Sequence, residues 1–130
     1  MRAKIWMYGI PMAGQTAERA RWIEDSGGDG LGVADTQNLA GDPYSALSLA
    51  ARSTTRIGLG TAVTNPITRH PAVTASAIMT VQVESAGRAV LGIGRGDSSL
   101  AYLGRKPASL AQFQAYLWSS HCLEWSSKKD

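Results

Sequence analysis

Two aspartates, Asp35 and Asp97, each stand directly beyond a short, glycine-containing apolar segment. A carboxylate at the end of a buried strand is well placed to transfer a proton or to bind the polar edge of a ring, and burial can tune its pKa. Aspartate is also a common turn residue and helix cap, so a structural role is favoured for either residue taken alone. For the pair, the spacing leaves catalysis and structure evenly balanced.

Polar loops follow three apolar segments of the sequence, at 34–39, 61–71 and 94–100. In a parallel barrel the carboxyl ends of all strands meet at one rim, where the chemistry lies. We therefore expect the three loops to converge. The glycines of 92–97 do not have the spacing of the dinucleotide fingerprint, and the Arg-Gly-Asp tripeptide within this segment is an adhesion motif only on an extracellular loop. We interpret the segment as a flexible backbone edge that lets a flat ligand come close.

Other reactive residue types give weaker signals. His70 precedes Pro71, where a single histidine is more often a structural residue that caps a helix than a catalytic one. No His, Cys or carboxylate pair has metal-ligand spacing, so we expect no metal site. The single cysteine, Cys122, permits no internal disulfide and is interpreted as a reduced thiol.

The elements that must position these residues alternate between strand and helix. Strands are expected at 4–9, 30–34, 56–63 and 89–94. Helices are expected to follow a Thr16 cap, to open at Asp42-Pro43 and at Pro71, and to follow a Ser109 cap. This alternation predicts an α/β fold with a parallel sheet and right-handed crossovers, namely the N-terminal half of a TIM barrel. A doubly wound sheet is the rival architecture, but the expected glycine-rich loop does not follow the first strand.

Apolar residues at helical spacing predict which side of each helix is buried. The predicted inward residues are Ala20 and Ile23 in the first helix, Leu47, Ala50 and Ala51 in the second, Val73, Ala77 and Val81 in the third, and Leu110, Phe113 and Leu117 in the fourth. Residues 118–130 have no clear helical stripe and are predicted to be an irregular tail or a frayed helix end. The partial barrel domain is therefore assigned to 1–117.

Composition bounds the class of protein. The chain has 130 residues, 44% hydrophobic and 18% charged, which suits one domain with a packed core. The net charge of +3 is scattered, so it indicates at most a weak preference for anionic ligands, and nucleic-acid binding ranks last. No apolar run is long enough to cross a membrane, and the N-terminus lacks the apolar core of a signal peptide. We therefore expect a cytoplasmic protein.

Three blocks of the sequence, at 34–44, 60–71 and 87–98, resemble the luciferase-like monooxygenase superfamily. They are most similar to its flavin- or deazaflavin-dependent oxidoreductases, the group that includes methylene-tetrahydromethanopterin reductase. The blocks keep their order and spacing within residues 4 to 117. The resemblance implies an enzyme that transfers hydride between a cofactor, FMN or the deazaflavin coenzyme F-420, and a small organic substrate.

The resemblance also implies where the cofactor ring is held. A non-proline cis peptide at Ala62-Val63 would support the back of the ring, and Thr64 and Asn65 would edge it. Gly94, Arg95 and Gly96 match the loop after the fourth strand. These residues and Thr36 are the expected cofactor contacts.

Two catalytic roles follow from the same resemblance. Asp97 matches an acidic position that serves proton transfer near the ring, and Asp35 matches an aspartate that contacts the cofactor or substrate. Thr36 stands where some deazaflavin-dependent members carry a histidine, so a mechanism through that histidine is not expected here.

The resemblance covers only four of eight barrel strands, and loops after strands seven and eight usually hold the cofactor phosphate. We therefore expect a truncated form of the enzyme. The alternative is a non-catalytic half-barrel that pairs into a homo-oligomer or binds a phosphorylated ligand without turnover.

Overall fold

The computed structural model describes residues 2–121 and contains one parallel sheet with four strands in the order β1-β2-β3-β4. The strands are β1 (Trp6–Gly9), β2 (Gly30–Val33), β3 (Gly58–Thr64) and β4 (Ala89–Ile93). The helices are α1 (Thr16–Asp25), α2 (Pro43–Ser53), α3 (Pro71–Glu84), α4 (Ser98–Tyr102) and α5 (Leu110–His121). The predicted half-barrel of strand–helix units is therefore confirmed.

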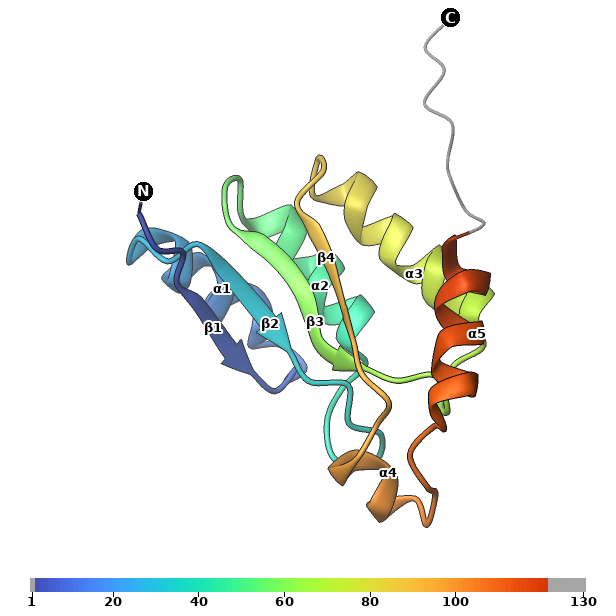
Figure 1. Ribbon diagram of the computed structural model, residues 1–130. Helices are drawn as coiled ribbons and strands as arrows, with labels where there is room; N and C mark the ends of the chain where they lie inside the picture. Colours follow the sequence, from blue (N-terminus) through green and yellow to red (C-terminus); the bar gives the residue numbers. More distant parts are fainter. Residues whose placement is uncertain (1, 122–130) are drawn as a thin grey trace, which may run out of the picture.

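One face of the sheet is covered by α1, α2 and α3, and α5 lies beside α3 (Figure 1). The core lies between this face and the helices, where Leu31, Leu47, Ile57 and Leu59 are fully buried. Leu31 in β2 and Leu59 in β3 alternate with glycines that belong to the other face. The sheet is thus packed on one side only.

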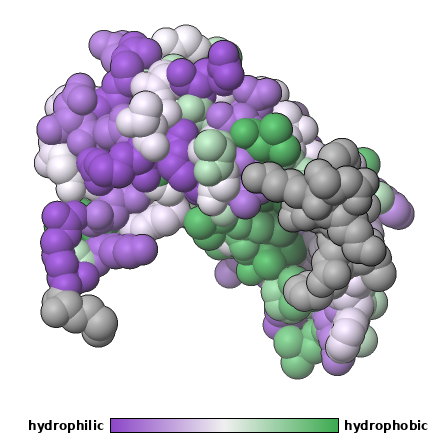
Figure 2. All heavy atoms as spheres, turned by 90° about the horizontal axis from the view of Figure 1, so that it is seen from above, coloured by the Kyte–Doolittle hydropathy of each residue, from purple (hydrophilic) through white to green (hydrophobic). Residues whose placement is uncertain are grey.

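The other face of the sheet is open and concave (Figure 2). The Trp6 ring lies across it at the amino ends of the strands, where a Cβ on Gly30 or Gly58 would stand 2.3 or 2.6 Å from the ring atoms. Trp6 is still 40% exposed, and Tyr8 and Val90 on the two edge strands are 66% and 45% exposed. Apolar surface therefore remains on the side where a closed barrel has its interior.

Two helix starts follow the sequence prediction. The Asp42 carboxylate accepts a 2.7 Å hydrogen bond from the Ser45 amide at the start of α2, with Pro43 as the first helical residue. His70 caps α3, because its Nδ1 accepts a 3.2 Å bond from the Ala72 amide. The structural interpretation of His70 is thus confirmed.

The prediction that Thr16 caps α1 is wrong. Thr16 is already helical and Gln15 holds the capping position without a side-chain bond. The Thr16 hydroxyl instead bonds to the backbone amide and carbonyl of Met12. It closes the turn that precedes the helix rather than capping it.

The predicted apolar stripes of α1 and α2 are confirmed, but those of the later helices are partly wrong. Val73 is 53% exposed on α3, and Leu110 is 71% exposed on α5. The buried residues at the contact between these two helices include Thr74 of α3 and Tyr116 of α5. Their hydroxyls lie 2.5 Å apart and satisfy each other as a hydrogen-bonded pair. Hydrophobic periodicity cannot detect a contact made by a polar pair.

The end of the described chain is helical. The helix α5 runs through Trp118 to His121, so residues 118–121 continue the helix and agree with the helix-end alternative. Ser109 caps this helix as predicted, accepting a bond from the Gln112 amide while the Gln112 side chain accepts one from the Ser109 amide. Residues 122–130, including Cys122, lie outside the described residues.

Candidate functional site

The loops after β2, β3 and β4 meet at the carboxyl edge of the sheet (Figure 1). The Thr64 hydroxyl at the end of β3 bonds to Asp35 after β2, and its carbonyl accepts a 2.9 Å bond from the Gly94 amide after β4. Thr64 therefore joins all three loops. The convergence predicted from the sequence is present.

The Ala62-Val63 peptide bond is cis, as the resemblance implied. It lies in an irregular stretch where the pairing of β3 with β4 shifts between Thr61 and Thr64. The Val63 side chain is 51% exposed, whereas Thr64 is fully buried. At the end of β3, the apolar side chain of Val63 is therefore available for contact with a ligand, and the side chain of Thr64 is buried in the protein.

Asp35 is 3% exposed, and both of its carboxylate oxygens have protein partners. Oδ1 accepts a 2.5 Å hydrogen bond from Gln37 Nε2, and Oδ2 accepts a 2.6 Å bond from the Thr64 hydroxyl. Arg69 Nε lies 3.6 Å from the same Oδ2. This is the geometry of an internal anchor, because the carboxylate is buried and both of its oxygens accept hydrogen bonds.

Arg69, in the loop after β3, connects three acidic or aromatic side chains. Beyond Asp35, its terminal nitrogen contacts the Asp42 carboxylate, and the guanidinium lies 4.8 Å from the centre of the Tyr44 ring. Burial lowers the pKa of Arg69, but the bond to Asp42 and the two nearby carboxylates outweigh this and raise it above its ordinary value. The arginine is therefore held as a cation in a half-buried position.

The same cluster shifts the pKa values of its neighbours. Burial raises the pKa of Asp42, but hydrogen bonds from Ser45 and Arg69 outweigh it, so the pKa lies below its ordinary value. Burial raises the pKa of the Tyr44 hydroxyl above its ordinary value, and the nearby Asp35 carboxylate raises it further. The tyrosine stays neutral and serves as an aromatic support for the guanidinium.

Asn65 is 2% exposed and shapes the loop after β3 from inside. Its Oδ1 accepts bonds from the amides of Ile67 and Thr68, at 3.0 and 3.1 Å. Its Nδ2 is buried and has no partner among residues 2–121. Asn65 Nδ2 and Arg69 Nε are therefore two buried donors near the rim that make no hydrogen bond to residues 2–121.

The loop after β4 contains glycines without side chains and an arginine, Arg95, whose side chain is hydrogen-bonded to the protein. Gly96 has φ +85°, and a Cβ there would stand 2.4 Å from Leu100, so only glycine fits. The Arg95 side chain donates a 2.6 Å bond to the Ala108 carbonyl and is thereby tied to the segment before α5. The glycines, rather than this arginine side chain, leave room at the rim.

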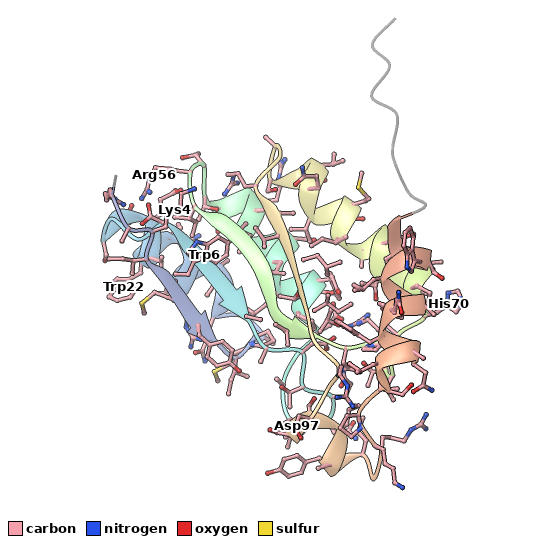
Figure 3. The ribbon with its side chains drawn as sticks, in the orientation of Figure 1. Lys4, Trp6, Trp22, Arg56, His70 and Asp97 are labelled. Carbon is pink, nitrogen blue, oxygen red and sulfur yellow. The ribbon has the colours of Figure 1, made fainter. Side chains whose placement is uncertain are left out.

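Asp97 directly precedes α4, and its carbonyl accepts bonds from the Leu100 and Ala101 amides. Its side chain is exposed and makes no hydrogen bond or ion pair within the described residues. Figure 3 shows Asp97 at the carboxyl end of the sheet and Lys4 and Arg56 at the other end. Thr36 is half-buried, and its carbonyl closes the turn to Leu39 and Ala40.

The sequence reasoning missed Arg69, Gln37 and Tyr44 as site residues. All three lie inside the blocks that carry the family resemblance, which was the available signal. Gln37 also lines a hollow between the loops after β2, β3 and α4, together with Thr68 and Arg105.

Two other kinds of feature are absent from the described part of the chain. Residues 2–121 contain no group of three or more His, Cys, Asp or Glu side chains arranged to hold a metal ion. No helix in this part is both long and apolar enough to span a membrane.

Comparison with known proteins assigns the chain to a family. Residues 4–117 match the family described as luciferase-like monooxygenase. The 5,10-methylenetetrahydromethanopterin reductase of Methanolobus tindarius is 43% identical over 83 residues, which are 64% of this chain and 25% of the relative. That of Archaeoglobus fulgidus is 51% identical over 74 residues, which are 57% of this chain and 22% of the relative.

Solved structures share the architecture. The coenzyme F-420 dependent tetrahydromethanopterin reductase of Methanopyrus kandleri has a TM-score of 0.72 and 34% identity, covering 82% of this chain and 31% of that one. The oxygenating constituent of 3,6-diketocamphane monooxygenase from Pseudomonas putida, solved with FMN, has a TM-score of 0.71 and 18% identity, covering 91% of this chain and 38% of that one. The chain spans about a quarter of the length of the curated relatives it matches. It belongs to the luciferase-like monooxygenase family.

Proposed function

We propose that this chain is the cofactor-supporting part of a flavin- or deazaflavin-dependent oxidoreductase that transfers hydride between its cofactor and a small organic substrate. The observation that carries the proposal is the convergence of three loops on Thr64 at the end of β3, where its hydroxyl bonds to Asp35 after β2 and its carbonyl accepts from Gly94 after β4. The 34% identity with an enzyme named as coenzyme F-420 dependent supports it. Residues 62–64 at the end of β3 form a backbone ledge held by these contacts, and a backbone held in place is what positioning a flat ring requires.

The residues of the rim fit such a ring. Val63 is exposed for apolar contact, and Ala62 and Gly94 are small. The buried Nδ2 of Asn65 has no acceptor among residues 2–121. We assign the remaining contacts to Thr36, Arg95 and Gly96, with Arg95 contributing its backbone. A bound flavin or deazaflavin supplies the hydride chemistry, and the similarity to both classes of relative leaves FMN and coenzyme F-420 as the two candidates.

Asp97 is the residue we assign to proton handling. Its carboxylate is exposed and makes no hydrogen bond or ion pair with residues 2–121, so it is able to take up or return the proton that accompanies a hydride. Asp35 contributes differently, since both of its oxygens already accept from protein donors. Its contribution to the site passes through Thr64.

We include in the proposal that the active form contains further barrel strands. The chain spans about a quarter of its relatives' length. In barrels of this kind the phosphate is usually held after strands seven and eight. Turnover on a small-molecule substrate is then a property of a longer protein that contains this part.

Thermal unfolding with each cofactor tests the binding part of the proposal. We expect a cooperative transition that rises with FMN or with coenzyme F-420, because a ligand at a hundredfold its Kd adds about 2.7 kcal/mol to the free energy of unfolding. Riboflavin without phosphate is the matched control for ring binding. A cooperative transition that neither cofactor shifts would contradict the proposal for this chain.

A non-catalytic half-barrel that pairs with a second copy is the second candidate. It is favoured by the exposed Trp6, Tyr8 and Val90 on the open face of the sheet and by the unpaired edges of β1 and β4. Rotation about an axis parallel to the strands would place β4 of each copy beside β1 of the other, closing eight parallel strands. Light scattering decides, because a monomer at all concentrations excludes pairing.

A further inference from the structure

The loop after β3 and the loop after β2 are tied together by a single cation, Arg69. Its side chain is 21% exposed and contacts the carboxylates of Asp35 and Asp42, while its flat face lies over Tyr44. Asp35 belongs to the loop after β2, and Asp42 caps α2. One side chain thus connects the rim to the helix that follows it.

Asp35 needs this cation because its carboxylate is 99% buried. A buried carboxylate is costly unless it is both hydrogen-bonded and paired with an opposite charge. Its two hydrogen-bond donors, Gln37 and Thr64, are neutral. Within residues 2–121, Arg69 is the only cationic side chain in an ion pair with it.

Thr64 converts the charge pair into a constraint on the rim. Its side chain is fixed by Asp35, its carbonyl accepts from the Gly94 amide, and its own peptide directly follows the cis Ala62-Val63 bond. Without Arg69, the Asp35 carboxylate would be a buried charge with no opposite charge beside it, and turning toward water would lower its free energy. The Thr64 hydroxyl would then lose its acceptor. The backbone at Val63 would then be free to shift.

We propose that Arg69 is a positioning residue that acts through Asp35 and Thr64 to hold the Ala62-Val63 ledge in place for the cofactor ring. The inference rests on the proposed function for its ligand, but the chain of contacts from Arg69 to Val63 stands without it. Arg69 itself does not touch the ring.

The test compares Arg69→Ala and Arg69→Lys with Arg52→Ala. Arg52 is the matched control, since its 3.6 Å pair with Glu84 is exposed and such pairs contribute little. We expect Arg69→Ala to weaken FMN or coenzyme F-420 binding at least tenfold, with partial recovery in Arg69→Lys and in Arg69→Ala supplied with methylguanidinium. Arg52→Ala should bind as the parent chain does. Equal affinity of Arg69→Ala and the parent would overturn the inference.

The backbone amides of Val63, Thr64 and Gly94, observed by nuclear magnetic resonance without cofactor, provide a second readout. We expect Arg69→Ala and Thr64→Val to shift the same three signals, and the double variant to shift them no further, because both act through Asp35. A parent chain that binds neither cofactor defeats the proposed function, and these signals still decide the inference. If they stay in place in Arg69→Ala while a folded spectrum is retained, Arg69 does not position the ledge.

Discussion

The Thr64 hydroxyl donates a 2.6 Å hydrogen bond to Oδ2 of Asp35, although the two residues lie 29 positions apart in the sequence. Both side chains are buried, and each belongs to a different loop at the carboxyl edge of the sheet. The bond therefore replaces contact with water by contact between loops. It makes the end of β3 depend on a residue that follows β2.

Thr64→Val should destabilise the chain measurably, because it removes the hydroxyl and leaves a buried carboxylate with one donor fewer. Hydrogen bonds to charged groups contribute about 1.5–3 kcal/mol, and urea unfolding at pH 7 would measure the loss. Thr80→Val is the matched control, since the Thr80 hydroxyl bonds only to the Ser76 carbonyl on an exposed face of α3. An equal loss in the two variants would argue against a special role for the Asp35 bond.

Asp97→Asn should separate chemistry from binding. The capping bonds at α4 come from the Asp97 carbonyl, so the substitution leaves them intact, and the exposed side chain has no partner to lose within the described residues. In the cofactor-loaded, complete enzyme we expect turnover to fall about 10²- to 10⁴-fold, the usual contribution of a general acid or base. Cofactor affinity, measured by fluorescence titration, should stay within about twofold of the parent value. Unchanged turnover would remove Asp97 from the mechanism.

Glu24 predicts a pH dependence of stability at the opposite end of the sheet. Its carboxylate accepts hydrogen bonds from the amides of Thr55, Arg56 and Ile57, at 3.0, 2.5 and 3.1 Å. Burial raises the pKa of Glu24, but these bonds outweigh it, so the pKa lies below its ordinary value of 4.5. A lowered pKa in the folded state means that the stabilisation is present above the unfolded pKa and is lost as pH falls through the folded one.

Glu24→Gln tests this sign. The difference in unfolding free energy between the parent and the variant should be constant from neutral pH down to about pH 5 and should shrink at lower pH. Chemical denaturation at a series of pH values measures it. Asp25→Asn serves as the control, because Asp25 is exposed and has no hydrogen bond or ion pair within residues 2–121. A difference that grows as the pH falls would show that the carboxylate is not stabilised in the folded state.

The main elements were predictable from the sequence, because each has a local signal. Buried strands are continuous apolar runs, and Asp42-Pro43 and His70-Pro71 mark helix starts through caps that involve neighbouring residues only. The helix α4 was missed because five residues are too few to show a period. At 118–121 the sequence left a helix end and an irregular tail as alternatives, because serines and a tryptophan interrupt the apolar stripe while the backbone stays helical.

The site was predictable only as far as its loops. The cis Ala62-Val63 bond and the convergence of the rim followed from the resemblance and from strand order. The cluster around Asp35 did not, because the partners of a buried charge depend on tertiary contacts rather than on spacing. Arg69 and Asp35 lie in separate loops, and no periodic pattern connects them.

The last prediction concerns the hydroxyls of Thr74 and Tyr116, which lie 2.5 Å apart and buried between α3 and α5. Tyr116→Phe should cost about 1–2 kcal/mol, because Thr74 keeps a buried hydroxyl without its partner. Thr74→Val in that background should cost little more, since replacing both partners by apolar groups is nearly neutral. The double-mutant cycle, measured by urea unfolding, should therefore give a coupling of about 0.5–3 kcal/mol. Tyr102→Phe is the control, because the Tyr102 ring is exposed and its loss of a hydroxyl should not change the free energy of unfolding. Additive losses in the cycle would mean that α5 is held to α3 by apolar packing alone.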